Sequence, residues 1–352
     1  MVYPRHLLIV NYSMSTRNQL LSHQVDAVNA LATHFDEVTV ITPEYENSNL
    51  KSNVRVLKYE WNSNRKILSS TKFIIHLLGV CRTNRPSMVF YHMTDFHAAI
   101  SMPFLKLMRI RSVIWYAHKK NSMYFRISAI FSDKIVTSTL GSCPITGSKV
   151  EAIGQAIDSN IFSPRNTRKN FKFDKLIHIG RLDPSKKPDY ILEITHNLRE
   201  INNRISLTFV GSPGSTKNTE WYSKFQSQCE SQKWIKIYSG ILRKDIPEFI
   251  ETFDVFIHAY RGSLDKILLE TTMMKVPLIT ENPEYISIFG SWCGKSNPTL
   301  TEEYLSMRSL ENHELNTEIN RRAELTIKNH SQDGWAFKLS SILCAETNRG
   351  NH

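Results

Sequence analysis

The sequence predicts an α/β protein made of two doubly wound units, each a parallel sheet covered by helices. Short apolar, β-branched runs alternate with amphipathic stretches along most of the chain, which is the pattern of strands buried between helices. The length of 352 residues favours about two domains, each large enough to bury its own core.

The first half of the chain supplies six predicted strands with helices between most of them. The strands are expected at residues 6–11, 37–42, 53–58, 87–91, 112–117 and 133–138, and the helices at 18–34, 64–83, 95–109 and 122–132. The second half repeats this alternation, with strands at 174–180, 205–211, 235–239, 254–258 and 276–279. After Pro283 the chain is expected to be mostly helical.

Residues 162–171 are polar and basic and contain a proline, so they are predicted to form a hinge between the units. The domains are then residues 1–165 and 172–330. A C-terminal helix in residues 331–352 is expected to pack back across both, because 335–343 has a suitable apolar spacing. Two facing α/β units would place ligands in a cleft between the carboxyl ends of their sheets.

Composition narrows the class of protein and of partner. The net charge of +11 favours an acidic partner, which could be a nucleic acid, a phosphorylated substrate or an anionic membrane surface. The five cysteines are odd in number and widely spaced, which argues against a disulfide framework and a zinc site and fits the reducing cytosol. The N-terminus lacks the apolar core of a signal peptide, and the longest apolar stretch, residues 73–81, is too short to span a bilayer.

Residues 254–280 predict an anion site. A strand is followed by a tight turn at Gly262, a helix that carries Glu270 and a second strand. Such a turn directs backbone N–H groups and the positive end of the helix dipole toward a bound ligand.

A second basic site is predicted around Arg181 and Lys186. A helix is expected to begin at Ser185, just after Pro184, which places Lys186 and Lys187 at the positive end of its dipole, where cations are disfavoured. A bound diphosphate would remove this conflict. The alternative is that these lysines are solvated surface residues.

These stretches, together with residues 22–24, 113–119 and 153–164, resemble the retaining family 4 glycosyltransferases of GT-B fold over nearly the whole chain. The resemblance implies an N-terminal acceptor domain and a C-terminal nucleotide-sugar domain, both Rossmann-like, facing a central cleft. It also implies transfer, with retention, from a UDP-, GDP- or ADP-sugar to a hydroxyl of a glycan or lipid-linked acceptor, in cytoplasmic synthesis of cell-surface polysaccharide or glycoconjugate. No cofactor is expected. The chain has no D-x-D motif, so no catalytic metal is expected either.

The resemblance also assigns residue roles in donor binding. Glu270 accepts hydrogen bonds from the ribose hydroxyls, and His118 contacts the donor sugar. Arg181 and Lys186, beside Gly180, stabilise the departing diphosphate, which takes the acceptor proton. The family's usual glutamate facing the sugar corresponds to Gly262, so Asp265 or the amides of Ser263 and Leu264 are the candidates for that contact.

The acceptor site is less defined by the sequence. Asn11 and Ser13 follow the first strand, and His92 and Asp95 follow the fourth, so all four are candidates, although turn chemistry and helix capping explain them as well. Residues 65–82 and 104–111 alternate basic and apolar faces. Such helices can lie on anionic lipid at the inner membrane face, or pack on the sheet with their basic residues in water.

Two other classes of function remain open. A GT-B epimerase or hydrolase of nucleotide sugars would use the same phosphate and ribose groups but would need further acid–base residues in the cleft. A non-catalytic nucleic-acid binder would explain the net charge, but no aromatic platform motif accompanies the basic residues, so no nucleic acid is expected as a partner.

Overall fold

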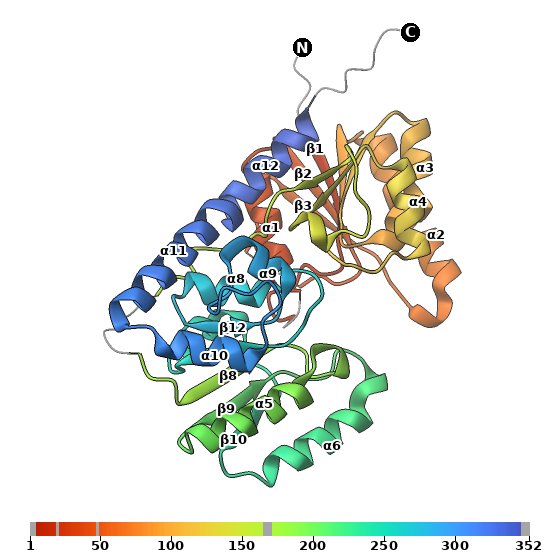
Figure 1. Ribbon diagram of the computed structural model, residues 1–352. Coiled ribbons are helices and arrows are strands. Elements are labelled where there is room, and N and C mark those ends of the chain that lie inside the picture. The colour runs from red at the N-terminus through yellow and green to blue at the C-terminus, as the bar shows by residue number, and fades with distance from the viewer. Residues whose placement is uncertain (1–4, 19–20, 47–48, 165–170, 346–352) are drawn as a thin grey trace. The chain divides into compact units, whose positions relative to one another are not determined.

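The computed structural model describes residues 5–18, 21–46, 49–164 and 171–345. The chain divides into two compact units (Figure 1). Unit 1 comprises Met1–Ala156 and His330–His352, and unit 2 comprises Ile157–Asn329. The change of unit after Ala156 precedes the predicted hinge at 162–171, of which residues 165–170 lie outside the described part of the chain.

Unit 1 contains a parallel sheet with the strand order β3-β2-β1-β4-β5-β6-β7. Its strands are β1 (His6–Val10), β2 (Glu37–Thr42), β3 (Val54–Lys58), β4 (Met88–His92), β5 (Arg111–Trp115), β6 (Lys134–Thr137) and β7 (Val150–Ala152). Its helices are α1 (His23–Ala32), α2 (Lys66–Thr83), α3 (Asp95–Leu107), α4 (Met123–Phe131) and α12 (Gln332–Cys344). The six predicted strands are confirmed to within two residues, whereas β7 was not predicted because it has three residues with a glutamate at its centre.

The central strands of this sheet are buried on both faces, which explains their continuous apolar sequences. Leu7 and Ile9 of β1 lie in the core beneath α1 and α12, and Leu8 and Val10 lie in the core beneath α2, α3 and α4. Trp335 of α12 is 1% exposed and packs in the first of these cores. Figure 1 shows α12, in blue, beside α1.

The predicted start of the first helix is wrong, since α1 begins at His23 rather than near residue 18. The polar side chains ahead of it hydrogen-bond the backbone in turns instead. The Asn18 side chain accepts from the Leu21 N–H, and the Ser15 hydroxyl accepts from the Arg17 N–H. This competition with helical hydrogen bonds is typical of asparagine.

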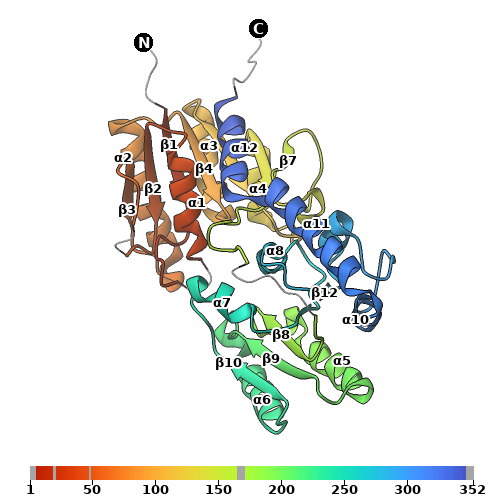
Figure 2. The ribbon, with the colours of Figure 1, turned by 90° about the vertical axis from the view of Figure 1, so that its left-hand side faces the viewer.

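Unit 2 contains a parallel sheet with the order β10-β9-β8-β11-β12 (Figure 2). Its strands are β8 (Lys175–Ile179), β9 (Ser206–Val210), β10 (Ile235–Tyr238), β11 (Val255–His258) and β12 (Leu278–Thr280). Its helices are α5 (Pro188–Ile201), α6 (Thr219–Glu230), α7 (Ile246–Ile250), α8 (Lys266–Met273), α9 (Pro283–Phe289), α10 (Leu300–Ser309) and α11 (Asn312–His330). One core lies under α5, α6 and α10, and the other lies under α7, α8 and α9. The predicted helical C-terminal region is confirmed.

The strand order of each sheet locates the point at which ligands bind in such folds. In unit 2 the chain runs from β8 outward to β9 and β10, then returns to β11 on the other side of β8. The loops after β8 and β11 therefore flank the topological switch point at the carboxyl edge, where α/β proteins bind ligands. In unit 1 the corresponding point lies between β1 and β4.

None of the five cysteines forms a disulfide. Among the helices of the described residues, none combines the length and the hydropathy that crossing a membrane requires.

Candidate active site

The loop after β8 presents Arg181, and two glycines make room for it. A Cβ on Gly214 would lie 2.7 Å from Arg181 Cδ, and a Cβ on Gly211, whose φ is +148°, would lie 1.8 Å from the Gly180 oxygen. Arg181 Nη1 lies 3.9 Å from Asp183 Oδ2, and its side chain keeps 44% of its surface exposed. The guanidinium thus lies near a carboxylate and is still accessible to a ligand.

The predicted helix start at Ser185 is wrong. Pro184–Lys186 form a single 3-10 turn, and α5 begins at Pro188. Lys187 separates the two helical segments with a left-handed φ of 55°, and Pro188 follows it as the first residue of α5. Lys186 therefore lies outside the first turn of α5, and the predicted conflict with the helix dipole does not arise.

Lys186 instead occupies a buried position between a carboxylate and an aromatic ring. Its side chain is 8% exposed, and Nζ donates a 2.5 Å hydrogen bond to Asp265 Oδ2. Nζ also lies 3.6 Å from the centre of the Tyr260 ring, a cation–π contact. Burial lowers the pKa of Lys186, and the charge of Asp265 partly opposes this.

Asp265 is held by a second contact, with His258. His258 Nε2 lies 3.0 Å from Asp265 Oδ2, and its Nδ1 lies 3.0 Å from Thr280 Oγ1. Burial alone would raise the pKa of Asp265, but the hydrogen bond from His258 and the charge of Lys186 outweigh it and hold the pKa well below its usual range. Burial also lowers the pKa of His258. Asp265 is therefore an ionised carboxylate that balances the Lys186 charge.

Gly262 lies directly against Tyr260. A Cβ at position 262 would lie 2.0 Å from Cζ and Oη of the Tyr260 ring, so any side chain there would displace the ring that covers Lys186. This contact gives a steric reason why the chain has glycine at this position. The carboxylate nearest to Lys186 comes instead from Asp265, three residues later.

Hydrogen bonds from the Asn282 side chain stabilise the turn between β11 and α8. Its Nδ2 donates to the backbone oxygens of Tyr260 at 2.9 Å and Ser263 at 3.1 Å. Leu264 is 3% exposed and packs in the core, so its side chain does not reach a ligand. Ser263 is 6% exposed.

Glu270 of α8 is 3% exposed and paired with an arginine that sequence reasoning missed. Arg243 Nη1 donates a 2.5 Å hydrogen bond to Glu270 Oε1, and the guanidinium lies 4.8 Å from the centre of the Phe162 ring. Arg243 belongs to the turn that follows β10, and no motif marks it. The sequence offers one indication of its role, which is that this basic residue follows β10, a strand of the same sheet as β8 and β11.

The candidate residues of unit 1 lie at or just after the ends of the neighbouring strands β1, β4 and β5. Asn11 Nδ2 lies 3.2 Å from Met14 Sδ, and Ser13 is fully buried. The His92 ring packs 6.1 Å from that of Trp335, and Asp95 Oδ2 accepts a 2.7 Å hydrogen bond from Ser122 at the start of α4. His118 is exposed beyond β5, with its ring 5.8 Å from that of Tyr116. Of these, Asp95 has a clear structural role, since it joins α3 to α4.

A family model of known proteins matches most of unit 2. Residues 160–287 match the family model described as Glycosyl transferases group 1, and this segment contains Arg181, Lys186, Asp265 and Glu270. A comparison with curated proteins finds no match.

Solved structures match nearly the whole chain at low sequence identity. HepE from Anabaena, in complex with UDP and glucose, is 10% identical with a TM-score of 0.73, over 98% of this chain and 100% of HepE. Sucrose-phosphate synthase from Thermosynechococcus elongatus is 9% identical with a TM-score of 0.75, over 96% and 98% of the two chains. A glycosyltransferase from Rickettsia africae is 13% identical with a TM-score of 0.71, over 98% and 100%. The chain therefore has the GT-B fold, carries a glycosyl transferases group 1 domain in residues 160–287, and is a glycosyltransferase.

Proposed function

We propose that this glycosyltransferase transfers a sugar from a UDP-sugar to a hydroxyl of a glycan or lipid-linked acceptor, with retention at the anomeric carbon. One observation carries the proposal: Arg181 and Lys186 follow β8, and the turn leading to Glu270 follows β11, at the switch point of the unit 2 sheet. The uridine nucleotide is favoured because HepE was solved with UDP-glucose and a TarM variant from S. aureus with UDP.

The diphosphate of the donor binds to Arg181 and Lys186. An ammonium group has three N–H donors, so Lys186 can hold Asp265 and a phosphate oxygen together. Charge-assisted hydrogen bonds of this kind contribute about 1.5–3 kcal/mol each. As the bond to the sugar breaks, negative charge grows on the diphosphate, and the two cations stabilise it.

Glu270 binds the ribose hydroxyls. A carboxylate offers about four acceptor positions on two oxygens, so the hydrogen bond from Arg243 to Oε1 leaves acceptor capacity for a diol. Arg243 then acts as a positioning residue, because its hydrogen bond fixes the plane of the carboxylate.

Asp265 replaces the missing glutamate at position 262 and faces the donor sugar. It is ionised, and Lys186 and His258 fix its orientation. His118 contacts the same sugar, and Asn11, Ser13, His92 and Asp95 contribute to the acceptor site. The leaving phosphate accepts the acceptor proton, and transfer uses neither a cofactor nor a metal because Arg181 and Lys186 donate charge-assisted hydrogen bonds to the diphosphate as its negative charge grows.

The setting we propose is the cytoplasm, in the synthesis of a cell-surface polysaccharide or glycoconjugate. A reducing compartment is consistent with five cysteines that form no disulfide. A lipid-linked acceptor is favoured by the structural likeness to the lipopolysaccharide outer core galactosyltransferase WaaB, which is 9% identical with a TM-score of 0.64.

A thermal-shift screen with UDP-, GDP- and ADP-sugars tests the proposal, since a ligand that binds only the folded state raises its stability. We expect a shift with UDP-sugars. Proton NMR of the product should then show the anomeric configuration of the donor. Conversion of the donor sugar to its free epimer without any acceptor would instead make the chain an epimerase.

A further inference from the structure

Helix α2 of unit 1 has an apolar stripe that faces away from the core. Ile67, Leu68, Ile75 and Leu78 are 86%, 51%, 62% and 38% exposed. At 3.6 residues per turn these four positions fall on one side of the helix. The other side is buried on the sheet, for example through Phe73. The helix is therefore apolar on two sides, and only one of them is covered by unit 1.

The segment that contains α2 carries most of the net positive charge of the chain. Residues 51–85 contain eight Lys and Arg and a single Glu, a net charge of +7 out of +11. The one carboxylate, Glu60, is paired with Lys72. Arg55, Lys66 and Arg82 are exposed. In the rest of the chain 36 Lys and Arg are nearly balanced by 32 Asp and Glu. The unbalanced charge of residues 51–85 points to an extended anionic partner.

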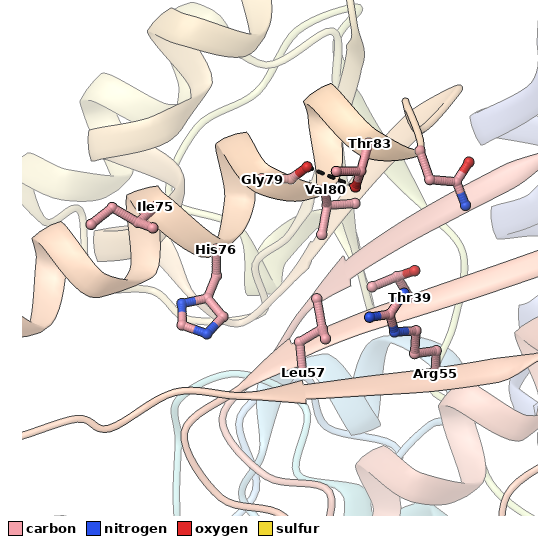
Figure 3. Close-up of a pocket in the computed structure, with 9 residues that line it drawn as sticks. Thr39, Arg55, Leu57, Ile75, His76, Gly79, Val80 and Thr83 are labelled. Carbon is pink, nitrogen blue, oxygen red and sulfur yellow. Dashed lines mark hydrogen bonds between the residues drawn. The ribbon is translucent and has the colours of Figure 1, made fainter.

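A cavity beside the stripe is lined both by an apolar residue of the stripe, Ile75, and by a basic residue, Arg55. It has a volume of about 300 Å³ and lies between α2 and the strands β2 and β3, where β3 is the edge of the sheet. Figure 3 shows His76 and Val80 of α2 pointing toward Leu57 on the strand, with Arg55 from the same strand below them. The cavity is thus lined by the aliphatic side chains of Leu57, Ile75 and Val80 together with polar groups, among them Arg55.

We propose that α2 and β3 form a docking face for an anionic phospholipid bilayer. The stripe enters the acyl region, and Arg55 and Arg82 contact lipid phosphates, with the cavity receiving part of one lipid next to Arg55. Helix α2 has an exposed aliphatic side and flanking cations, and it contains no carboxylate. These features suit an anionic lipid surface better than they suit a neutral partner. Docking there would bring unit 1 to the surface that holds a lipid-linked acceptor.

The test is co-sedimentation of the full chain with vesicles of phosphatidylglycerol and phosphatidylcholine, and with phosphatidylcholine alone, in the absence of any nucleotide sugar. We expect binding to the anionic vesicles at low salt that is at least tenfold tighter than to the neutral ones and weakens as salt screens the charges. The double variant Ile67→Asp/Ile75→Asp and the double variant Arg55→Ala/Arg82→Ala should each lose at least tenfold in affinity.

Two matched controls introduce the same aspartate at exposed aliphatic positions elsewhere. Leu107→Asp lies on α3, 82% exposed, and Ile201→Asp lies at the end of α5 in unit 2, 57% exposed. Both should keep vesicle binding within about twofold of the unsubstituted chain, and every variant should keep its circular dichroism spectrum and UDP-induced thermal shift. Because the vesicle assay contains no donor, its result does not depend on the proposed transfer reaction.

Several outcomes would overturn the proposal. One is that the unsubstituted chain does not bind anionic vesicles. Another is that the α2 variants and the two control variants lose vesicle affinity equally. If vesicle binding is lost only in the variant Leu107→Asp, the membrane contact belongs to α3. A dimer in sedimentation velocity that Ile67→Asp/Ile75→Asp dissociates, without vesicle binding, would assign the face to a second copy. Retention by single-stranded RNA through Arg55 and Arg82, without vesicle binding, would assign it to nucleic acid.

Discussion

Lys186 and Asp265 lie 79 positions apart in the sequence and are joined by a 2.5 Å hydrogen bond at the carboxyl edge of the unit 2 sheet. The cation assigned to the donor diphosphate is therefore already oriented and charge-balanced before any ligand binds. Burial of the pair makes the interaction sensitive to the charge state of each partner.

Donor affinity should fall at alkaline pH. Lys186 binds phosphate only when protonated, and burial places its pKa below the ordinary 10.5. Affinity is therefore full below that pKa and is lost as the pH rises through it, earlier than for an exposed lysine. Asp265→Asn removes a charge that raises the pKa of Lys186, so the loss should move to lower pH.

Calorimetric titration with a UDP-sugar between pH 7 and 10 measures this effect. In Lys186→Arg the alkaline loss should disappear, because a guanidinium stays protonated throughout the range. An identical pH profile for Lys186→Arg and the unsubstituted chain would rule out Lys186 as the titrating group.

Arg181→Ala should weaken UDP-sugar binding by about ten- to hundredfold, corresponding to the loss of charge-assisted hydrogen bonds worth about 1.5–3 kcal/mol. The melting temperature without ligand should stay nearly constant, because the side chain is 44% exposed. The matched control is Arg204→Ala, whose arginine also faces an aspartate but is 75% exposed. The control should keep its ligand-induced thermal shift, and a shift that survives in Arg181→Ala would contradict the role of Arg181.

Arg243→Ala should lower the free energy of unfolding of unit 2 by about 3–5 kcal/mol, since it leaves the Glu270 carboxylate buried without its cation. Urea denaturation measures this loss. Arg204→Ala, which breaks the exposed pair with Asp174, should cost less than about 1 kcal/mol. Equal costs for the two variants would show that Arg243 and Glu270 are not a buried pair.

Gly262→Glu should impair the site rather than improve it, although it restores the glutamate that the family resemblance leads one to expect. The new side chain would displace the Tyr260 ring from Lys186, at a cost of about 1–3 kcal/mol for overpacking, and would weaken UDP-sugar binding.

The double variant Tyr260→Ala/Gly262→Glu removes the clash and should recover stability. Gly79→Glu, at a glycine with no neighbouring atom within 4 Å, is the control for the substitution itself and should leave the melting temperature nearly unchanged. Tighter donor binding in the single variant Gly262→Glu would show that Tyr260 does not occupy the position of the missing side chain.

The sequence predicted the central strands well because they are buried on both faces, so each is a short apolar run. The errors occur where local side-chain chemistry decides the backbone. Turn-forming polar residues before His23 delay α1, and the left-handed Lys187 before Pro188 delays α5.

The predicted site residues came from motifs that are local in sequence, such as Gly180-Arg181 and the turn at Gly262. The residues that were missed depend on contacts between loops. Arg243 reaches Glu270 across 27 positions, and His258 acquires its role from the position of Asp265. Spacing within one segment cannot reveal such pairs, because they form only when the strands align at the same edge of the sheet.

A crystal of the chain soaked with UDP tests the central claim most directly. We expect diphosphate density within hydrogen-bonding distance of Arg181 and Lys186, with the ribose hydroxyls on the Glu270 carboxylate. Ordered UDP bound elsewhere, with Arg181, Lys186 and Glu270 making no contact to it, would contradict the account.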